Sequence, residues 1–220
     1  MKKTLCLFSL LFFLLLAGNV SAQNEKADKF WKTLQTYYFL HDKSLVNQTI
    51  DYLNAGVYDA NVFELRFRAF YCALFGVDGK IKADFQSKLK KIKSAELQDM
   101  FETITNSNID DIYTNAPETP DANEMLCYSY YATGDSRYID RLLEKAKGND
   151  ERKDLDKYMI GANALWWLAT LRDENILVKQ YLEAKTADKA AEIALTSRAY
   201  DLKNIQLDVL ADQKKKGIWK

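Results

Sequence analysis

The chain is poor in the residues that interrupt helices. Its 220 residues include two prolines and eight glycines. These two residue types destabilise a helix interior most, so their scarcity leaves long helices with few interruptions. Strand signals are almost absent as well, because no alternating run of apolar and polar residues is bounded by turn residues. Composition and patterning therefore predict an all-α fold.

The chain also has few residues suited to metal binding or nucleophilic catalysis. Its single histidine, His41, lies at a predicted turn, where we expect a capping role rather than a place in a serine-histidine-aspartate triad. The sequence contains no HExxH or CxxC motif and no glycine-rich phosphate loop. Its acidic residues from 110 to 124 lack the spacing of a calcium-binding loop. We predict no catalytic residue, cofactor or metal, while carboxylate pairs for acid-base chemistry stay open.

The first 22 residues have the features of an export signal. Two lysines precede an almost wholly apolar run from Leu5 to Gly18, and Val20-Ser21-Ala22 supplies small residues before a cleavage site. The run of about 14 residues is shorter than the roughly 20 that a membrane span needs. We predict a signal peptide at 1–22 and an exported protein, periplasmic or secreted, without a transmembrane anchor after cleavage. An uncleaved anchor is the alternative.

Charge is nearly balanced overall but unevenly distributed along the chain. Without the two leader lysines, 29 Lys and Arg stand against 31 Asp and Glu, which gives no reason to expect nucleic acid as a partner. Six lysines lie between Lys80 and Lys93 around an apolar stripe, which predicts an amphipathic helix with a solvated basic face. An anionic partner or membrane surface is the alternative. From Ser94 to Ser136 there is no Lys or Arg, and nine Asp and Glu occur.

Residues 119–146 carry the clearest local signal, that of two helices joined by a tight turn. Thr119 and Pro120 suit the start of a helix, as a capping residue and a first-turn proline. Apolar residues follow at helical spacing until Gly134, which is typical of a left-handed helix end. Asp135 can cap a second helix, in which apolar residues again recur every three or four positions.

The same pattern recurs over three further segments, 30–52, 64–92 and 161–184. Each of the four turns contains an acid, namely Asp42, Asp78, Asp135 and Asp173. Successive acids in this series are 36, 57 and 38 residues apart. Spacings of about 34 to 47 residues are those of helical-hairpin repeats. The largest gap leaves room for an extra helix over 95–105. We expect an array of antiparallel helical hairpins, an α-solenoid of about nine to ten helices.

The expected array forms one domain over residues 23–220. Residues 106–115 read as a polar connection closed by Pro117 and Pro120, so we place a hinge near 106–120. After the central hairpin we expect two long helices, one from 151 to 171 and one from 187 to 212.

The central hairpin resembles a tetratricopeptide repeat at six positions: Leu126, Tyr130, Gly134, Asp135, Leu143 and Ala146. It departs from that family at Ile139, where alanine is preferred, and in lacking a closing proline near Glu151. The resemblance implies a superhelical scaffold whose concave face binds a peptide or protein, and it implies no catalytic residues. HEAT-like packing fits the looser pattern of the whole chain nearly as well.

Aromatic residues gather shortly before each predicted turn. Each group ends within eight residues of its turn acid: Tyr37, Tyr38 and Phe39; Phe70 and Tyr71; Tyr128, Tyr130 and Tyr131; Trp166 and Trp167. This recurrence predicts one layer of aromatic side chains packed between helices. A partly open aromatic groove for a peptide, glycan or lipid is the alternative.

We therefore expect a non-enzymatic extracytoplasmic binding or scaffolding protein with a protein or peptide partner. Stacked repeats create long concave surfaces, which the first helices of the hairpins would line. The alternatives are a carrier of an apolar ligand in an aromatic-lined groove and an all-α enzyme with a carboxylate-based site. Asn123 and Tyr130 are expected to face outward, and the full set of candidate binding residues is Asn123, Tyr128, Tyr130, Tyr131, Trp166 and Trp167.

Two cysteines, Cys72 and Cys127, remain once residues 1–22 are removed. Both lie in the first helices of predicted hairpins, where a small buried thiol packs well. Export also permits a disulfide between them. We expect two buried thiols, with the disulfide as the alternative.

The export signal makes a prediction about processing. When the full chain is expressed in a bacterial host with a compatible export pathway, the exported protein should begin at Gln23, because the small residues before it suit the signal peptidase. Intact mass spectrometry of the exported fraction measures this directly. Exported protein that retains residues 1–22 would contradict it.

Overall fold

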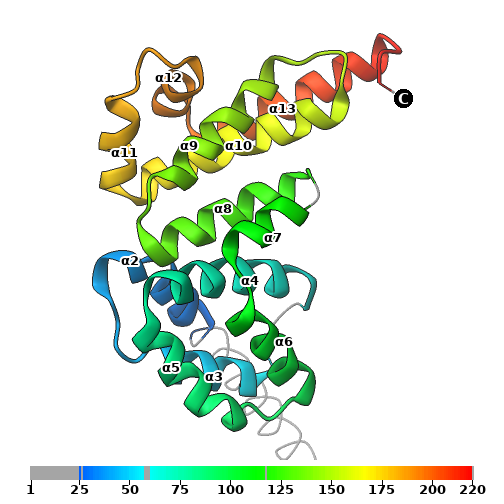
Figure 1. Ribbon diagram of the computed structural model, residues 1–220. Coiled ribbons are helices and arrows are strands. Elements are labelled where there is room, and N and C mark those ends of the chain that lie inside the picture. The colour runs from blue at the N-terminus through cyan, green and yellow to red at the C-terminus, as the bar shows by residue number, and fades with distance from the viewer. Residues whose placement is uncertain (1–24, 26, 57–59, 117, 220) are drawn as a thin grey trace, which may run out of the picture.

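The computed structural model describes residues 25, 27–56, 60–116 and 118–219. In this part of the chain every regular element is helical and no strand occurs, which confirms the all-α prediction (Figure 1). The predicted signal peptide and its cleavage site lie outside the described residues. After a helical segment at 27–35, the elements are α2 (Tyr37–Leu40), α3 (Leu45–Ala55), α4 (Ala60–Val77), α5 (Gly79–Lys88), the short 3-10 helix η1 (Leu89–Lys91), α6 (Ala95–Asn106), α7 (Ile109–Asn115), α8 (Pro120–Thr133), α9 (Arg137–Ala146), the 3-10 helix η2 (Lys147–Asp150), α10 (Leu155–Glu174), α11 (Ile176–Glu183), α12 (Lys189–Thr196) and α13 (Ala199–Lys215).

Helices α4, α8 and α10 form the centre of the molecule. In Figure 1, α3, α5 and α6 lie below α4, and α8 lies between α4 and α10. Helices α9, α11, α12 and α13 all contact α10, while α2 contacts α8 and α7 contacts α4. Ten of the 14 residues of α8 are buried, so this helix is covered on nearly all sides. A helix that is apolar all round is expected in such an interior position.

Buried polar side chains connect α8 to its neighbours. The Ser129 hydroxyl donates a hydrogen bond to the carbonyl oxygen of Ala69 in α4 (3.1 Å) and lies 2.7 Å from the hydroxyl of Tyr113 in α7. On the other side, Asn123 Nδ2 donates to the Ile160 carbonyl (2.9 Å) and to Asn163 Oδ1 (3.0 Å), both in α10, while Asn123 Oδ1 has no partner among the described residues. Most buried polar groups have such partners, and these contacts help to fix how the three central helices are placed.

Aromatic side chains fill the space between α4, α5 and α6. The rings of Phe85 and Phe101 are stacked with centroids 4.7 Å apart, and Tyr71 lies against both at 5.3 and 5.4 Å. The ring of Tyr37 contacts that of Phe70 at 5.9 Å. The predicted packing role therefore holds for Tyr37, Phe70 and Tyr71, which are buried.

The turn after α8 shows why Gly134 is needed there. Its backbone has φ of +68°, and its N–H donates to the carbonyl of Tyr130, which ends α8 in the predicted left-handed conformation. A Cβ at this position would also lie 2.9 Å from Cδ2 of Tyr38. Glycine is thus required both for its backbone conformation and for the close approach of Tyr38. His41 ends α2 in the same left-handed conformation, as its predicted turn position requires.

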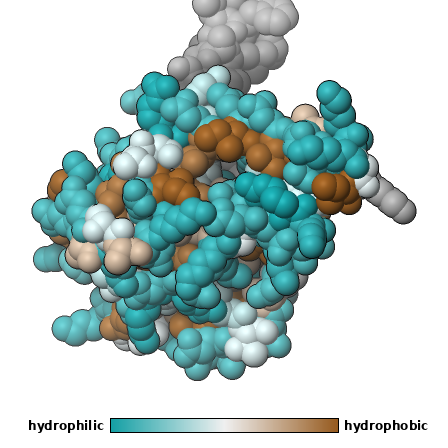
Figure 2. Space-filling model, turned by 90° about the horizontal axis from the view of Figure 1, so that it is seen from above, coloured by the Kyte–Doolittle hydropathy of each residue, from teal (hydrophilic) through white to brown (hydrophobic). Residues whose placement is uncertain are grey.

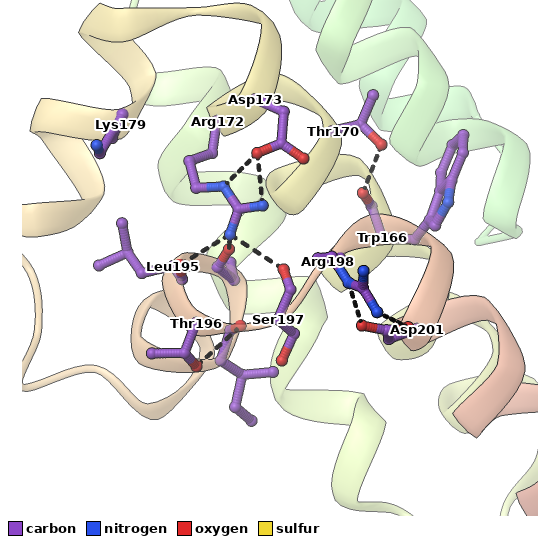
Figure 3. A network of polar contacts seen from close by, with 12 residues as sticks. Trp166, Thr170, Arg172, Asp173, Lys179, Leu195, Thr196, Ser197, Arg198 and Asp201 are labelled. Atoms are coloured by element: carbon purple, nitrogen blue, oxygen red, sulfur yellow. Dashed lines mark hydrogen bonds and ion pairs between the residues drawn. The ribbon is translucent and has the colours of Figure 1, made fainter.

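The predicted helix over 187–212 is wrong in one respect, because the chain breaks into α12 and α13. Ser197 and Arg198 are extended, and Arg172 from α10 reaches the end of α12 (Figure 3). Its Nη1 donates to the carbonyl oxygens of Ala194 (2.6 Å), Leu195 (2.8 Å) and Ser197 (3.0 Å). A helix end leaves such carbonyls without partners, so a distant arginine makes this break favourable.

Two further predicted boundaries are wrong for local reasons. Residues 109–115, expected to lie in a connection, form α7, because the Asn108 side chain caps its first turn by accepting from the Asp110 N–H (3.0 Å). Helix α10 continues through Glu174, and Asn175 rather than Asp173 caps the next helix. With the break in the last predicted helix, these differences give more helices than the nine or ten expected. The hinge near 106–120 stays a prediction.

The C-terminal helix is held by a second hydrophobic cluster. Trp219 is buried and its ring lies 5.1 Å from that of Tyr158 in α10. Met159 and Leu210 pack against the same cluster. The residues after α13 therefore return to the body of the protein.

The two cysteines are free and buried. Cys72 Sγ lies 3.6 Å from the carbonyl oxygen of Ile104, and Cys127 Sγ lies 3.3 Å from that of Asn123. Burial raises the pKa of the Cys72 thiol to about 12 and that of Cys127 well above its usual value. The structure thus agrees with two thiols rather than a disulfide.

The contacts of Arg172 predict that it contributes more to stability than Arg198, the other arginine in Figure 3. The Arg172→Met substitution should lower the free energy of unfolding by about 2 kcal/mol, because it leaves partly buried helix-end carbonyls without a donor. The Arg198→Met substitution is the matched control, since Arg198 pairs with Asp201 in an exposed position and should change stability by less than about 1 kcal/mol. Urea unfolding followed by circular dichroism measures both. Equal effects would contradict the capping role of Arg172.

Burial of the thiols predicts their reactivity. With residues 23–220, DTNB at pH 8 should label two thiols per chain after denaturation without reductant, since the chain then holds two free thiols. Native protein should react far more slowly, because the thiolate is the reactive form and burial keeps both thiols protonated. Absence of free thiols in the denatured, unreduced protein would establish a disulfide or other oxidation instead.

Candidate functional site

The turns that follow α2, α8 and α10 meet at one end of the molecule. The ring of Tyr38 lies 5.2 Å from that of Tyr130, and Asn175 Nδ2 donates a hydrogen bond to the Tyr38 hydroxyl. In Figure 1 the turn between α4 and α5 lies on the same side of the molecule as α2. The pKa of Tyr37 in α2 is raised by burial and then by the negative charges of Asp78 and Asp42. We call this region the turn end of the protein.

A groove of about 650 Å³ opens at the turn end. Its lining comes from residues 32–40 and from residues 174–177, where α10 gives way to α11, which we call its two walls, and from Tyr131 of α8, which we call its floor. We call this space the turn-end groove; it is lined by Lys32, Gln35, Thr36, Tyr38, Phe39, Leu40, Tyr131, Glu174, Asn175, Ile176 and Leu177.

The two walls carry large apolar side chains that remain in contact with solvent. Phe39 and Leu40 are 69% and 62% exposed, and Ile176 and Leu177 on the facing wall are 62% and 46% exposed. The face seen from above also carries hydrophobic patches within a mainly hydrophilic surface (Figure 2). Exposed apolar residues gathered in one place mark interaction sites more often than isolated ones do.

A buried tyrosine orients the carboxylate of the groove. Tyr131 is 2% exposed, and its hydroxyl donates a hydrogen bond to Glu174 Oε2 at 3.0 Å. Burial, as the largest effect, raises the pKa of Tyr131, so its hydroxyl keeps its proton and remains a donor. Asn175 is held in turn, because its Oδ1 accepts the N–H groups of Leu177 (2.9 Å) and Val178 (3.3 Å). The polar side of the groove is therefore fixed before any ligand enters.

A charged pair lies on the same face of the central helices. Arg66 in α4 contacts Glu124 Oε1 in α8 through Nε (2.9 Å) and Nη2 (2.7 Å). The guanidinium carbon lies 5.3 Å from the ring centre of Trp31 and 5.5 Å from that of Tyr128. Both charges are compensated within the protein, so this pair joins three helical segments rather than offering an open charge.

The candidate residues predicted from the sequence fall into three groups. Asn123, Tyr128 and Tyr130 are buried, so the expectation that Asn123 and Tyr130 face outward is wrong. The reason is that α4 covers one side of α8 and α10 the other. Tyr131 lines the groove.

The third group, the pair Trp166 and Trp167, is half-buried in α10. Their rings meet edge to face with centroids 4.8 Å apart. Trp166 is shown beside Arg172 in Figure 3, and its carbonyl oxygen accepts a hydrogen bond from Thr170 Oγ1 at 2.9 Å. Neither tryptophan lines the turn-end groove.

The main wall residues of the groove were not among the candidate binding residues. Phe39 was assigned to the packed aromatic layer, but it is exposed. Helical spacing does not single out Leu40, Ile176 or Leu177. A useful signal was available, because two adjacent apolar residues stand directly beside a turn at both 39–40 and 176–177, where polar residues are usual.

Two other types of site were considered within the described residues. None of their His, Cys, Asp and Glu side chains form a group of three or more that could hold a metal ion. Among the helices of this same part, none combines the length and apolar character needed to cross a membrane. The turn-end groove is therefore the feature from which a function can be argued.

The chain was also compared with known proteins. No family model, curated protein or solved structure matches it. The resemblance of residues 119–146 to a tetratricopeptide repeat therefore stays a prediction, and the function has to be inferred from the groove itself.

Proposed function

We propose that the protein is a non-enzymatic binding protein whose turn-end groove holds an apolar segment of a peptide or protein partner. The observation that carries the proposal is the pair of facing apolar walls, Phe39 with Leu40 and Ile176 with Leu177. Fixed polar groups accompany them at Glu174 and Asn175. Apolar surface with a few placed hydrogen-bonding groups is the usual composition of a binding site.

The proposed architecture is a short array of helical hairpins. In this arrangement α4, α8 and α10 are the first helices of successive units, and α5, α9 and α11 are the second ones. In support, α4 packs on α8 and α8 on α10, while each first helix also contacts the helix that follows it. Arrays of this kind place their binding surfaces along one side of the stack, as a tetratricopeptide-like protein would.

The open form of the groove favours a peptide over an enclosed apolar ligand. Sites for small molecules usually cover 70–90% or more of the ligand surface. Here the four apolar wall residues are 46–69% exposed, so both walls are open to solvent. A chain that enters at one end and leaves at the other suits such a groove. A carrier of an apolar ligand is therefore the less favoured candidate.

A binding role also fits the chemistry of the groove better than catalysis by a carboxylate pair. Of the described residues that line it, Glu174 alone carries a carboxylate. Acid-base catalysis between two carboxylates would need a second one at the reacting bond. Glu124, the nearby acid on α8, already pairs with Arg66.

We further propose that this binding takes place outside the cytoplasm, in the periplasm or after secretion. Support comes from the basic, apolar and small-residue regions of residues 1–22, which have the order of a signal peptide. The partner would then be a protein or peptide of the same compartment.

The apolar walls predict where substitution should remove binding. Dodecapeptides selected by phage display on residues 23–220 should bind at least about tenfold more weakly to a variant with Phe39→Ser and Ile176→Ser, because a few apolar anchors carry most interface energy. Its melting temperature should stay close to that of the unsubstituted protein, since both side chains are largely exposed. Fluorescence anisotropy measures the binding, and circular dichroism the melting.

The matched control for this experiment is Val77→Ser. Val77 is 68% exposed, much as Phe39 is, but it lies at the end of α4 and does not line the groove. Its substitution should leave peptide binding unchanged. Selected peptides that bind the double variant as tightly as the unsubstituted protein would contradict the proposal, and so would a selection that yields no binding peptide.

A further inference from the structure

The turn end is rich in acidic residues for a structural reason. Acids favour helix N-termini, where their side chains accept backbone N–H groups and interact well with the helix dipole. Asp42, Asp78 and Asp135 precede helices that begin at this end, whereas Asp173 and Glu174 are the last residues of α10. Basic residues stand beside four of these acids, namely Lys43, Lys80, Arg137 and Arg172, so the charge of the turn end is nearly balanced and single carboxylates have to be compared.

Most of these acids are already engaged. Asp78 accepts the N–H groups of Lys80 (2.9 Å) and Ile81 (3.0 Å), and Asp42 accepts from the N–H and hydroxyl of Ser44 (2.8 and 2.6 Å). Asp135 and Asp173 each pair with an arginine two residues or one residue away. These four carboxylates are thus engaged within the protein.

Glu174 differs from them because half of its carboxylate remains open. Its Oε2 accepts from Tyr131, while Oε1 has no partner among the described residues. The carboxylate lines the groove between the apolar wall residues and the floor. The buried hydroxyl of Tyr131 thus holds Oε2 in place, and this contact also sets the direction of Oε1. Such an arrangement reduces the entropy that a partner must overcome on binding.

Lys32 is the positive group of the same lining, and it is not held in this way. It is exposed, and no ion pair or side-chain hydrogen bond fixes its ammonium group among the described residues. A long exposed lysine side chain can direct its charge into solvent while its aliphatic part remains along the wall. The oriented charge in the groove is therefore the negative one.

Building on the proposed function, we propose that the turn-end groove takes an extended peptide segment in which two large apolar residues adjoin a lysine or arginine. The apolar pair lies between Phe39 with Leu40 and Ile176 with Leu177, and the cation pairs with Glu174. Charge complementarity of this kind acts mainly on specificity and association rate.

The test uses three fluorescein-labelled dodecapeptides that share a central leucine-phenylalanine pair. The pair is flanked on both sides by lysine in the first peptide, by glutamine in the second and by glutamate in the third. Anisotropy at low salt should show the lysine peptide binding about fivefold more tightly than the glutamine peptide, and the glutamate peptide binding most weakly. The preference should shrink as salt is added, because ions screen it.

Two glutamate substitutions locate the source of the preference. The Glu174→Gln variant keeps an acceptor for Tyr131 but loses the charge, so the lysine and glutamine peptides should bind it about equally. The control is Glu183→Gln, which changes an exposed glutamate at the other end of α11, outside the groove. This control should keep about the same fivefold preference.

The outcomes separate this inference from the proposed function. All three peptides could bind equally well, with this binding lost in the variant with Phe39→Ser and Ile176→Ser. That result would overturn the charge preference and leave the proposed peptide binding in place. Tighter binding of the glutamate peptide, abolished by Lys32→Gln, would overturn it in favour of acidic segments. Failure of all three peptides to bind would overturn both.

Discussion

The structure depends on the enclosure of α8 between α4 and α10. A helix covered on both sides needs partners for the polar groups that it carries inward, and the Ser129 hydroxyl and the Asn123 amide nitrogen bond to the two flanking helices. These bonds set the relative positions of the three helices. They also bring the ends of the helices together, because Gly134 at the end of α8 lies directly against Tyr38. The groove is a consequence of that alignment, since its walls belong to the turns on either side of α8.

Much of the helical pattern could be predicted because its signals are local. The extra helix expected over 95–105 is α6, and Thr119, Pro120 and Gly134 mark the ends of α8 as expected. The break between α12 and α13 could not be read locally, because the donor that completes the end of α12 is Arg172, more than twenty residues earlier in the chain. A sequence indicates which helix ends are possible, whereas the packed structure decides which are satisfied.

The groove was harder to predict than the fold for a different reason. Helical spacing indicates which residues share a face but not how many faces neighbouring helices will cover. Neighbouring helices cover nearly all faces of α8, and this buries Asn123 and Tyr130. The wall residues posed the opposite problem, because Phe39 and Ile176 stand beside turns that are remote in sequence. The contact between Tyr38 and Asn175, across 137 residues, shows that these turns are neighbours.

This separation along the chain has a thermodynamic consequence. An unfolded chain holds the two walls of the groove far apart, so it has no site, and a ligand of the groove binds the folded state alone. Occupancy therefore acts as a noncovalent brace between residues 32–40 and residues 174–177, and at a ligand concentration 100 times the dissociation constant it adds about 2.7 kcal/mol to the free energy of unfolding. Helices α3 to α9 lie between the braced segments in the chain, so their loss by unfolding or proteolysis is slowed along with that of the groove itself.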